Sequence, residues 1–119
     1  MLTPFQNSID LLSNIKNNKL YNELINQLNK DLSLTGNNLH FSKDYVPLTL
    51  KNELQIKIKE LINNDFNLFT NLLYRIDVSE KDIKNIDPVD VDVYSENITF
   101  LILKRIWKKV WFKHQYTEK

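Results

Sequence analysis

The sequence contains no cysteine and no alanine, and it has only one glycine and three prolines. Without cysteine the chain can form no disulfide framework, no thiol nucleophile and no thiolate metal site. The longest unbroken apolar run, Phe100 to Leu103, is four residues, whereas a helix needs about 20 to cross a bilayer. We therefore expect no membrane span. The first residues also lack the basic region and apolar run of a signal peptide, so we expect a cytoplasmic protein.

Positive and negative charges nearly balance one another, with 16 basic and 15 acidic residues and a formal net charge of +1. No global electrostatic attraction to nucleic acid or to a membrane surface follows from this balance. A chain of 119 residues that is 42% hydrophobic is of the size of one domain and can bury a core. We expect residues 1–119 to form a single helical domain.

Apolar residues recur at helical rather than strand spacing along most of the chain. Thr3-Pro4 predicts a helix start, and Asn17-Asn18 predicts a break between two tandem helices, because asparagine is a poor helix former. A stripe of apolar residues over 49–76 predicts a long central amphipathic helix of about 40 Å. The sequence thus predicts an all-α fold, a four- or five-helix bundle.

Two segments fit more than one structure. In residues 32–48, apolar residues alternate on both sides of a turn at 35–38, which fits a short β-hairpin, but two strands alone are marginal. We expect an ordered loop there, lying over the bundle. Valine alternates with aspartate over 89–93, which is also a strand pattern, but it runs straight into helical spacing. We expect the last helix to extend from about Val91 to about Lys113.

Asp65 falls in the middle of the apolar stripe of the expected central helix. A buried carboxylate must be paired, protonated or placed at an opening. We expect a structural pair with a Lys, an Arg or a backbone donor. The functional alternative is a small enzyme that uses Asp65 as a general base or ligand contact.

Other catalytic signals are missing from the sequence. It has no phosphate-binding glycine loop, no nucleophile elbow and no pair of histidines at metal-binding spacing. Asp87, Asp90 and Asp92 lack the ligand spacing and the glycine of a calcium loop. We expect no enzymatic activity, no cofactor, no metal and no small-molecule substrate.

The segment Leu72 to Glu80 contains one of the two arginines of the chain. We interpret Arg75 as a clamp on Asp77, Glu80 or a helix C-terminus, with anion or partner recognition as the alternative. Ser79, followed three residues later by an aspartate, resembles a capping box and predicts a short helix.

The stretch from Asp65 to Glu80 resembles that of a group of small, uncharacterised bacterial all-helical proteins, which share an LLYRIDVSE-like segment. The resemblance covers about a seventh of the chain. It implies an all-helical fold, and it implies no activity and no functional residue.

The last expected helix carries the strongest functional pattern, with basic side chains on one side and aromatic ones spread around it. The basic residues are Lys104, Arg105, Lys108 and Lys109, and the aromatic ones are Trp107, Trp111 and Phe112. The aromatic residues span too wide an arc for one core, and such a helix can bind a nucleic-acid backbone, an anionic membrane or an acidic protein. The alternative without a binding function is that the apolar face of this helix belongs to the core and that its basic side simply faces solvent. We predict a non-catalytic protein–protein interaction or regulatory module, with a protein partner or self-association; the alternative is nucleic-acid binding through the basic helix.

Overall fold

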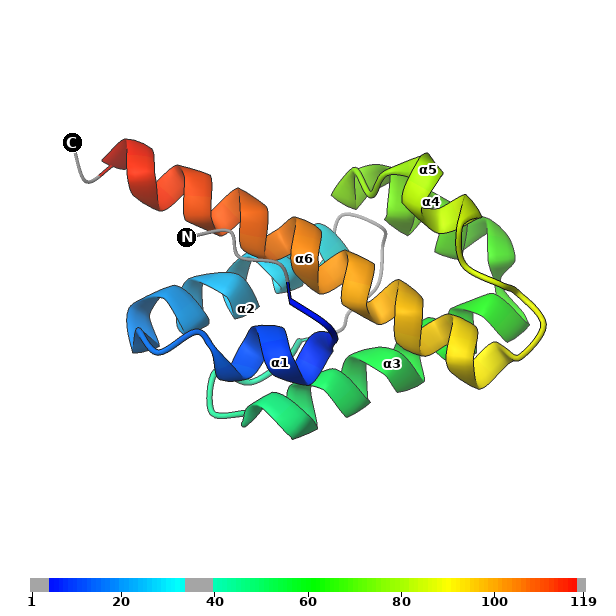
Figure 1. Ribbon diagram of the computed structural model, residues 1–119, viewed down its shortest axis with the longest axis horizontal. Helices are drawn as coiled ribbons and strands as arrows, with labels where there is room; N and C mark the ends of the chain where they lie inside the picture. The colour runs from blue at the N-terminus through cyan, green and yellow to red at the C-terminus, as the bar shows by residue number, and fades with distance from the viewer. Residues whose placement is uncertain (1–4, 34–39, 118–119) are drawn as a thin grey trace.

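The computed structural model describes residues 5–33 and 40–117, which form six α-helices and no strand (Figure 1). The helices are α1 (Ser8–Ser13), α2 (Asn18–Ser33), α3 (Pro47–Asn64), α4 (Phe66–Ile76), α5 (Glu80–Lys84) and α6 (Val91–Thr117). The predicted all-α fold is confirmed. Within the described ranges no helix has both the length and the apolar character needed to cross a membrane.

Helix α6, with 27 residues, is the longest and packs against each of the other five (Figure 1). Its residues Ile98, Ile102, Ile106 and Val110 are four apart and buried, because residues at this spacing share one face of a helix. The long amphipathic helix around which the bundle is built is therefore the last one, and not the segment 49–76.

Segment 49–76 is two helices, because the chain leaves helical geometry at Asp65 (φ −152°, ψ 75°). The Asp65 N–H donates to the carbonyl of Leu61 (2.9 Å), and Asp65 Oδ1 accepts from the N–H of Leu68 (3.1 Å). Two asparagines precede Asp65, and these residue types favour caps over helix interiors. This break makes the number of described helices six rather than four or five, and it leaves Asp65 exposed instead of in the apolar face.

The predicted break near the N-terminus is confirmed. Asn17 Oδ1 accepts from the N–H groups of Lys19 (2.9 Å) and Leu20 (3.2 Å), and so begins α2. Helix α1 starts only at Ser8, after Asn7, whose side chain caps it. Thr3-Pro4 lie outside the described residues, and no helix connects them with α1, because residues 5–7 are not helical.

Side-chain caps also decide where the last two helices begin. Asp90 Oδ1 accepts from the N–H of Asp92 (2.8 Å), so the predicted helix onset at Val91 is confirmed over the strand alternative. The hydroxyl of Ser79 accepts from the N–H of Asp82 (3.4 Å), which confirms the predicted short helix α5.

The connection between α2 and α3 lies partly outside the described residues, since 34–39 are not described. Its described part, residues 40–46, contains no strand and is held to α2 by specific hydrogen bonds. The Asn29 side-chain amide both donates to the Phe41 carbonyl (3.0 Å) and accepts from the Phe41 N–H (2.8 Å). The Tyr21 hydroxyl donates to the carbonyl of Tyr45 (2.6 Å).

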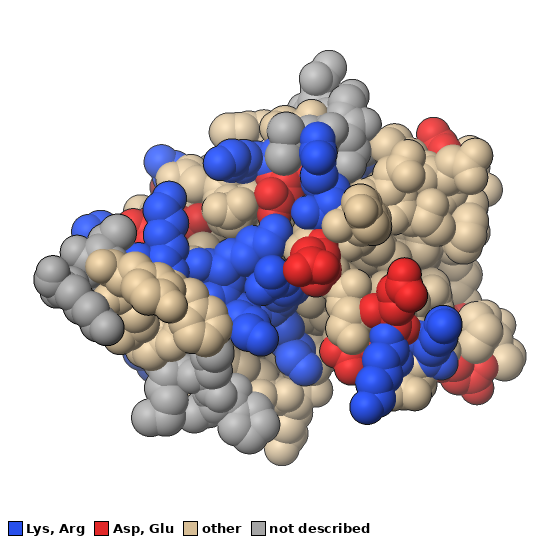
Figure 2. Space-filling model, turned by 90° about the horizontal axis from the view of Figure 1, so that it is seen from above, with Lys and Arg blue, Asp and Glu red and all other residues tan. Residues whose placement is uncertain are grey.

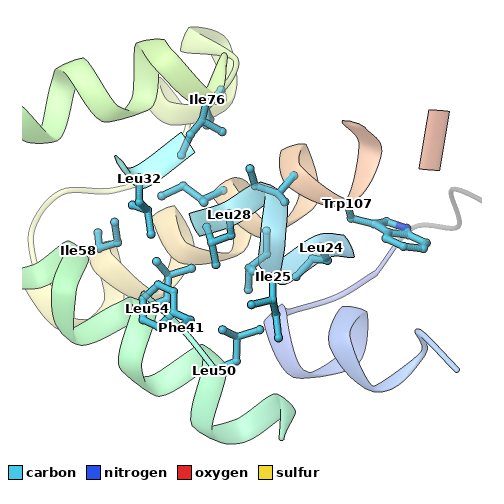
Figure 3. Packing of buried hydrophobic residues seen from close by; sticks show 14 of the residues in the cluster. Leu24, Ile25, Leu28, Leu32, Phe41, Leu50, Leu54, Ile58, Ile76 and Trp107 are labelled. Carbon is cyan, nitrogen blue, oxygen red and sulfur yellow. The ribbon is translucent and has the colours of Figure 1, made fainter. Parts of the chain in front are cut away.

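One core joins the helices, and α2 lies at its middle (Figure 3). Leu24, Leu28 and Leu32 of α2 are buried there against Leu54 of α3 and residues of α4 and α6. Phe41 closes the core from the α2–α3 connection.

Candidate functional site

The four basic residues singled out on α6 divide into two pairs. Lys104 and Lys108 are exposed, and neither forms an ion pair with another described residue. Lys104 Nζ lies 5.1 Å from the centre of the Phe100 ring, at cation–π distance. Arg105 and Lys109 are half-buried and are held by carboxylates of the chain itself, so only half of the predicted basic stripe is open to a partner.

Lys109 pairs with a carboxylate that the sequence analysis did not single out. Its Nζ lies 2.8 Å from Asp31 Oδ2, and the Asp31 side chain is only 7% exposed. Gln27 Nε2 donates to the other Asp31 oxygen (3.2 Å). One signal was present in the sequence, because Asp31 follows Leu24 by seven residues and therefore lies on the buried stripe of α2.

The three aromatic residues of α6 take three different environments. Trp107 is buried at the edge of the core (Figure 3), Trp111 is half-buried beside it with ring centres 6.1 Å apart, and Phe112 is 42% exposed. The two tryptophans line a hollow of about 380 Å³ together with Phe5 and other residues of the N-terminal segment. Trp107 Nε1 is buried without an acceptor in the described part of the chain.

An apolar groove lies between α4, α5 and the start of α6, with a volume of about 470 Å³. Its lining residues are Phe66, Phe69, Thr70, Leu73, Tyr74, Asp77, Val78, Ser79, Glu80, Ile83 and Tyr94. Two aromatic rings of this groove are strongly exposed, Phe66 by 56% and Tyr74 by 87%. Burial raises the pKa of the Tyr94 phenol above its ordinary value.

The sequence analysis did not identify this groove. Phe66 was part of the apolar stripe of the expected central helix, but the break at Asp65 places it at the first position of α4, where no neighbouring helix covers it. Tyr74 lies off that stripe, and a large aromatic residue outside the apolar face was the one sign in the sequence that a ring is exposed here.

A second, basic hollow of about 440 Å³ adjoins the groove and shares Asp77, Val78 and Ser79 with it. Its other lining residues are Asp82, Leu101, Lys104, Arg105 and Lys108. Figure 2 shows this side of the molecule, with Lys and Arg gathered at its middle and acidic side chains along their margin. The apolar groove and the basic hollow thus form one continuous surface, which we call the α4–α6 face.

The turn between the two hollows is held by an arginine, but a different one from that expected. Asp77 has left-handed backbone geometry (φ 69°, ψ 47°), which aspartate adopts more readily than most residues. Arg105 Nε donates to the Asp77 carbonyl and Nη2 to Asp77 Oδ2, both at 3.2 Å. Arg75 is exposed and forms no ion pair with another described residue. Arg105, rather than Arg75, therefore joins the end of α4 to α6.

Asp65 does not sit in a catalytic arrangement. It is exposed, and its carboxylate caps α4. In the part of the chain that the structure describes, no three His, Asp or Glu side chains gather closely enough to hold a metal ion. Ser79 likewise acts as a cap, on α5, and also lines both hollows.

Comparison of the chain with protein-family models, with curated proteins and with solved structures gives no match. The resemblance of residues 65–80 to a group of small bacterial helical proteins therefore stays a prediction. A function for this chain has to be inferred from its own surface.

Proposed function

We propose that the protein is a non-catalytic protein–protein interaction module that binds its partner through the α4–α6 face. The observation that carries this proposal is the exposure of two aromatic rings, Phe66 and Tyr74, beside an apolar groove of about 470 Å³. Exposed aromatic rings bordering a pocket are the side chains that contribute most to protein interfaces, because each buries a large area with few rotatable bonds.

The basic hollow beside the groove supports the same proposal. Protein interfaces combine an apolar centre with a polar rim that sets specificity and orientation. Here the groove supplies the apolar part, and Lys104 and Lys108 supply unpaired charge next to it. Arg105 contributes by fixing the turn between the two parts.

The predicted aromatic residues of α6 take a smaller share in this proposal. Trp107 is buried and so acts through the core, and Trp111 is half-buried against it. Phe112 lies one turn beyond Lys108 along α6 and remains exposed, so it can extend the contact at the basic end of the surface.

The proposal is tested by affinity purification from lysate of the source cells, with nuclease present, followed by mass spectrometry. The variant Phe66→Ser/Tyr74→Ala removes both exposed rings, and Ile56→Ser is the matched control, since Ile56 is 54% exposed on α3. We expect specific partners for the wild type and the control, and their loss with the double variant. If all three proteins retain the same partners equally, the proposal that the α4–α6 face is the binding surface is refuted.

Nucleic-acid binding is the second candidate, and the exposed Lys104 and Lys108 favour it. It predicts binding that weakens steeply with salt, with a smaller salt slope when both lysines are changed to glutamine. Asp77 and Asp82 line the same hollow and would repel closely spaced phosphates. This arrangement favours a protein partner. Salt-insensitive or undetectable binding of an oligonucleotide near 50 mM salt would eliminate the second candidate.

A further inference from the structure

We infer that the α4–α6 face binds the same face of a second copy of the chain, so that the protein forms a dimer with two-fold symmetry. In this dimer the carboxylates of Glu80 and Asp82 on each copy lie against Lys104 and Lys108 of the other. The inference rests on the proposed function, and it names a second copy as the partner that this function requires.

The first step concerns the charge on this face. Three acidic and three basic side chains line the two hollows, namely Asp77, Glu80, Asp82, Lys104, Arg105 and Lys108. The face therefore carries no net charge. Two copies that meet through it do not repel one another, as two faces of a single sign would.

The second step concerns how the two signs are distributed. All three basic side chains belong to α6, whereas the acidic ones belong to α5 and to the turn that leads into it. Lys81 and Lys84 are also on α5, but in the described chain they line neither hollow. Helices α5 and α6 pack against one another, and Figure 2 shows the acidic side chains along the margin of the basic ones. A two-fold axis that lies in the interface and runs between the two signs brings α5 of each copy onto α6 of the other.

The third step asks which of these charges are still available. Arg105 already holds Asp77 within the chain, at 3.2 Å. The two lysines of α6 and the two carboxylates of α5 are exposed and form no ion pair with any described residue. A partner that covers them must supply groups of both signs, because covering unpaired charge is costly. A second copy supplies two carboxylates for the two lysines and two lysines for the two carboxylates, so every group is matched.

The fourth step concerns the shape of the face. Phe66 and Tyr74 are 56% and 87% exposed, and they stand beside a groove of about 470 Å³ that adjoins a hollow of about 440 Å³. The face thus has both projecting and concave parts, as a two-fold interface requires, since each copy must insert and receive the same groups. An exposed ring can also lie against a lysine of the other copy, as Phe100 does with Lys104 within the chain at 5.1 Å.

The inference is tested by sedimentation velocity of the full chain from about 5 to 500 µM, a range that includes the roughly micromolar affinities of small interfaces. Two charge reversals are compared with the wild type. One makes α6 acidic, Lys104→Glu/Lys108→Glu, and the other makes α5 basic, Glu80→Lys/Asp82→Lys. Each reversal is measured alone and in an equimolar mixture with the other.

Two further variants complete the experiment. Tyr74→Ala removes the more exposed ring of the face. Lys19→Glu/Lys43→Glu is the matched control, because both of its lysines are exposed and line neither hollow. The circular dichroism of each variant shows whether it has folded.

We expect the wild type and the control to form dimers with the same Kd. Each reversal alone should weaken the dimer at least about tenfold, since the four charge pairs across the interface become repulsive. The mixture should form a heterodimer about as stable as the wild-type dimer, because each acidic helix again meets a basic one. Tyr74→Ala should weaken the dimer at least about tenfold, since both halves lose the ring. In the lysate experiment the native copy of the chain should then be the partner recovered.

Other outcomes separate the inference from the proposed function. A chain that stays monomeric throughout, while other lysate partners are lost with Phe66→Ser/Tyr74→Ala, would overturn the inference and leave the proposed function standing. A dimer that neither reversal weakens, or folded reversals that form no heterodimer when mixed, would also overturn the inference. A monomeric chain whose lysate partners are all retained by the double ring variant would overturn both.

Discussion

The ion pair between Lys109 and Asp31 joins α6 to α2, two helices that are far apart in the sequence, and we expect its loss to be costly. Replacing Lys109 by Met keeps most of the side-chain volume but leaves the Asp31 carboxylate, 7% exposed, with only the Gln27 amide as a partner. Breaking a buried pair typically costs about 3–5 kcal/mol. Because the Lys109 side chain is 22% exposed and water can approach it, we expect the low end, about 3 kcal/mol. A chain of this length has an unfolding entropy of about 0.25 kcal/mol/K, so Tm should fall by about 12 °C.

Urea unfolding followed by tryptophan fluorescence measures this loss directly, because Trp107 and Trp111 lie on the same helix as Lys109. The control is Asp31→Leu/Lys109→Met, which removes both charges and adds an apolar side chain next to Leu28 and Leu32. We expect this double variant to be at least about 1 kcal/mol more stable than Lys109→Met, since no unpaired charge remains buried. A loss below about 1 kcal/mol for Lys109→Met, or a double variant as unstable as the sum of its single changes, would refute the reasoning.

Three further variants test other contacts. Asp65→Ala removes the N-cap of α4 and should lower the free energy of unfolding by about 1 kcal/mol in urea titration, with Asp65→Asn near wild type; an effect of Ala no larger than that of Asn would contradict the capping role. Arg105→Gln breaks a pair whose Asp77 side chain is 80% exposed, so it should cost less than about 1 kcal/mol in the same titration; a cost near that of Lys109→Met would contradict this. Burial raises the pKa of Tyr21 above 10.0, so the unfolded chain loses that proton first as pH rises. Stability from this group is therefore full below about pH 10 and falls above it, and Tyr21→Phe should flatten the alkaline decline of Tm between pH 9 and 11; an unchanged decline would contradict the assignment.

The helical class and most helix starts were predictable, because they depend on local patterns. Asn17 and Ser79 use their side chains to cap the N–H groups that follow them, and such interactions are encoded within three or four residues. The break at Asp65 was missed because apolar spacing continues through it on both sides. Periodicity reports which face is apolar, and it does not show that the helix is continuous.

The sequence shows the basic and aromatic residues of α6, but it does not show which of them are exposed and unpaired in the folded chain. Lys104 and Arg105 are neighbours with similar chemistry, and only the second meets a carboxylate, that of Asp77 at the end of α4. The exposed Tyr74 gave only a weak signal, since a single aromatic residue off a stripe is common on protein surfaces.

The sequence alone determined the helical class, the approximate starts of α2, α5 and α6, and the basic character of the last helix, because each depends on residues that are close together along the chain. Tertiary structure decided which charges are cancelled and which apolar residues are covered. Lys109 meets Asp31 across 78 residues, and Phe66 stays exposed because the chain turns just before it. Both outcomes depend on how helices pack against one another, and side-chain contacts between distant segments leave no periodic trace in the sequence.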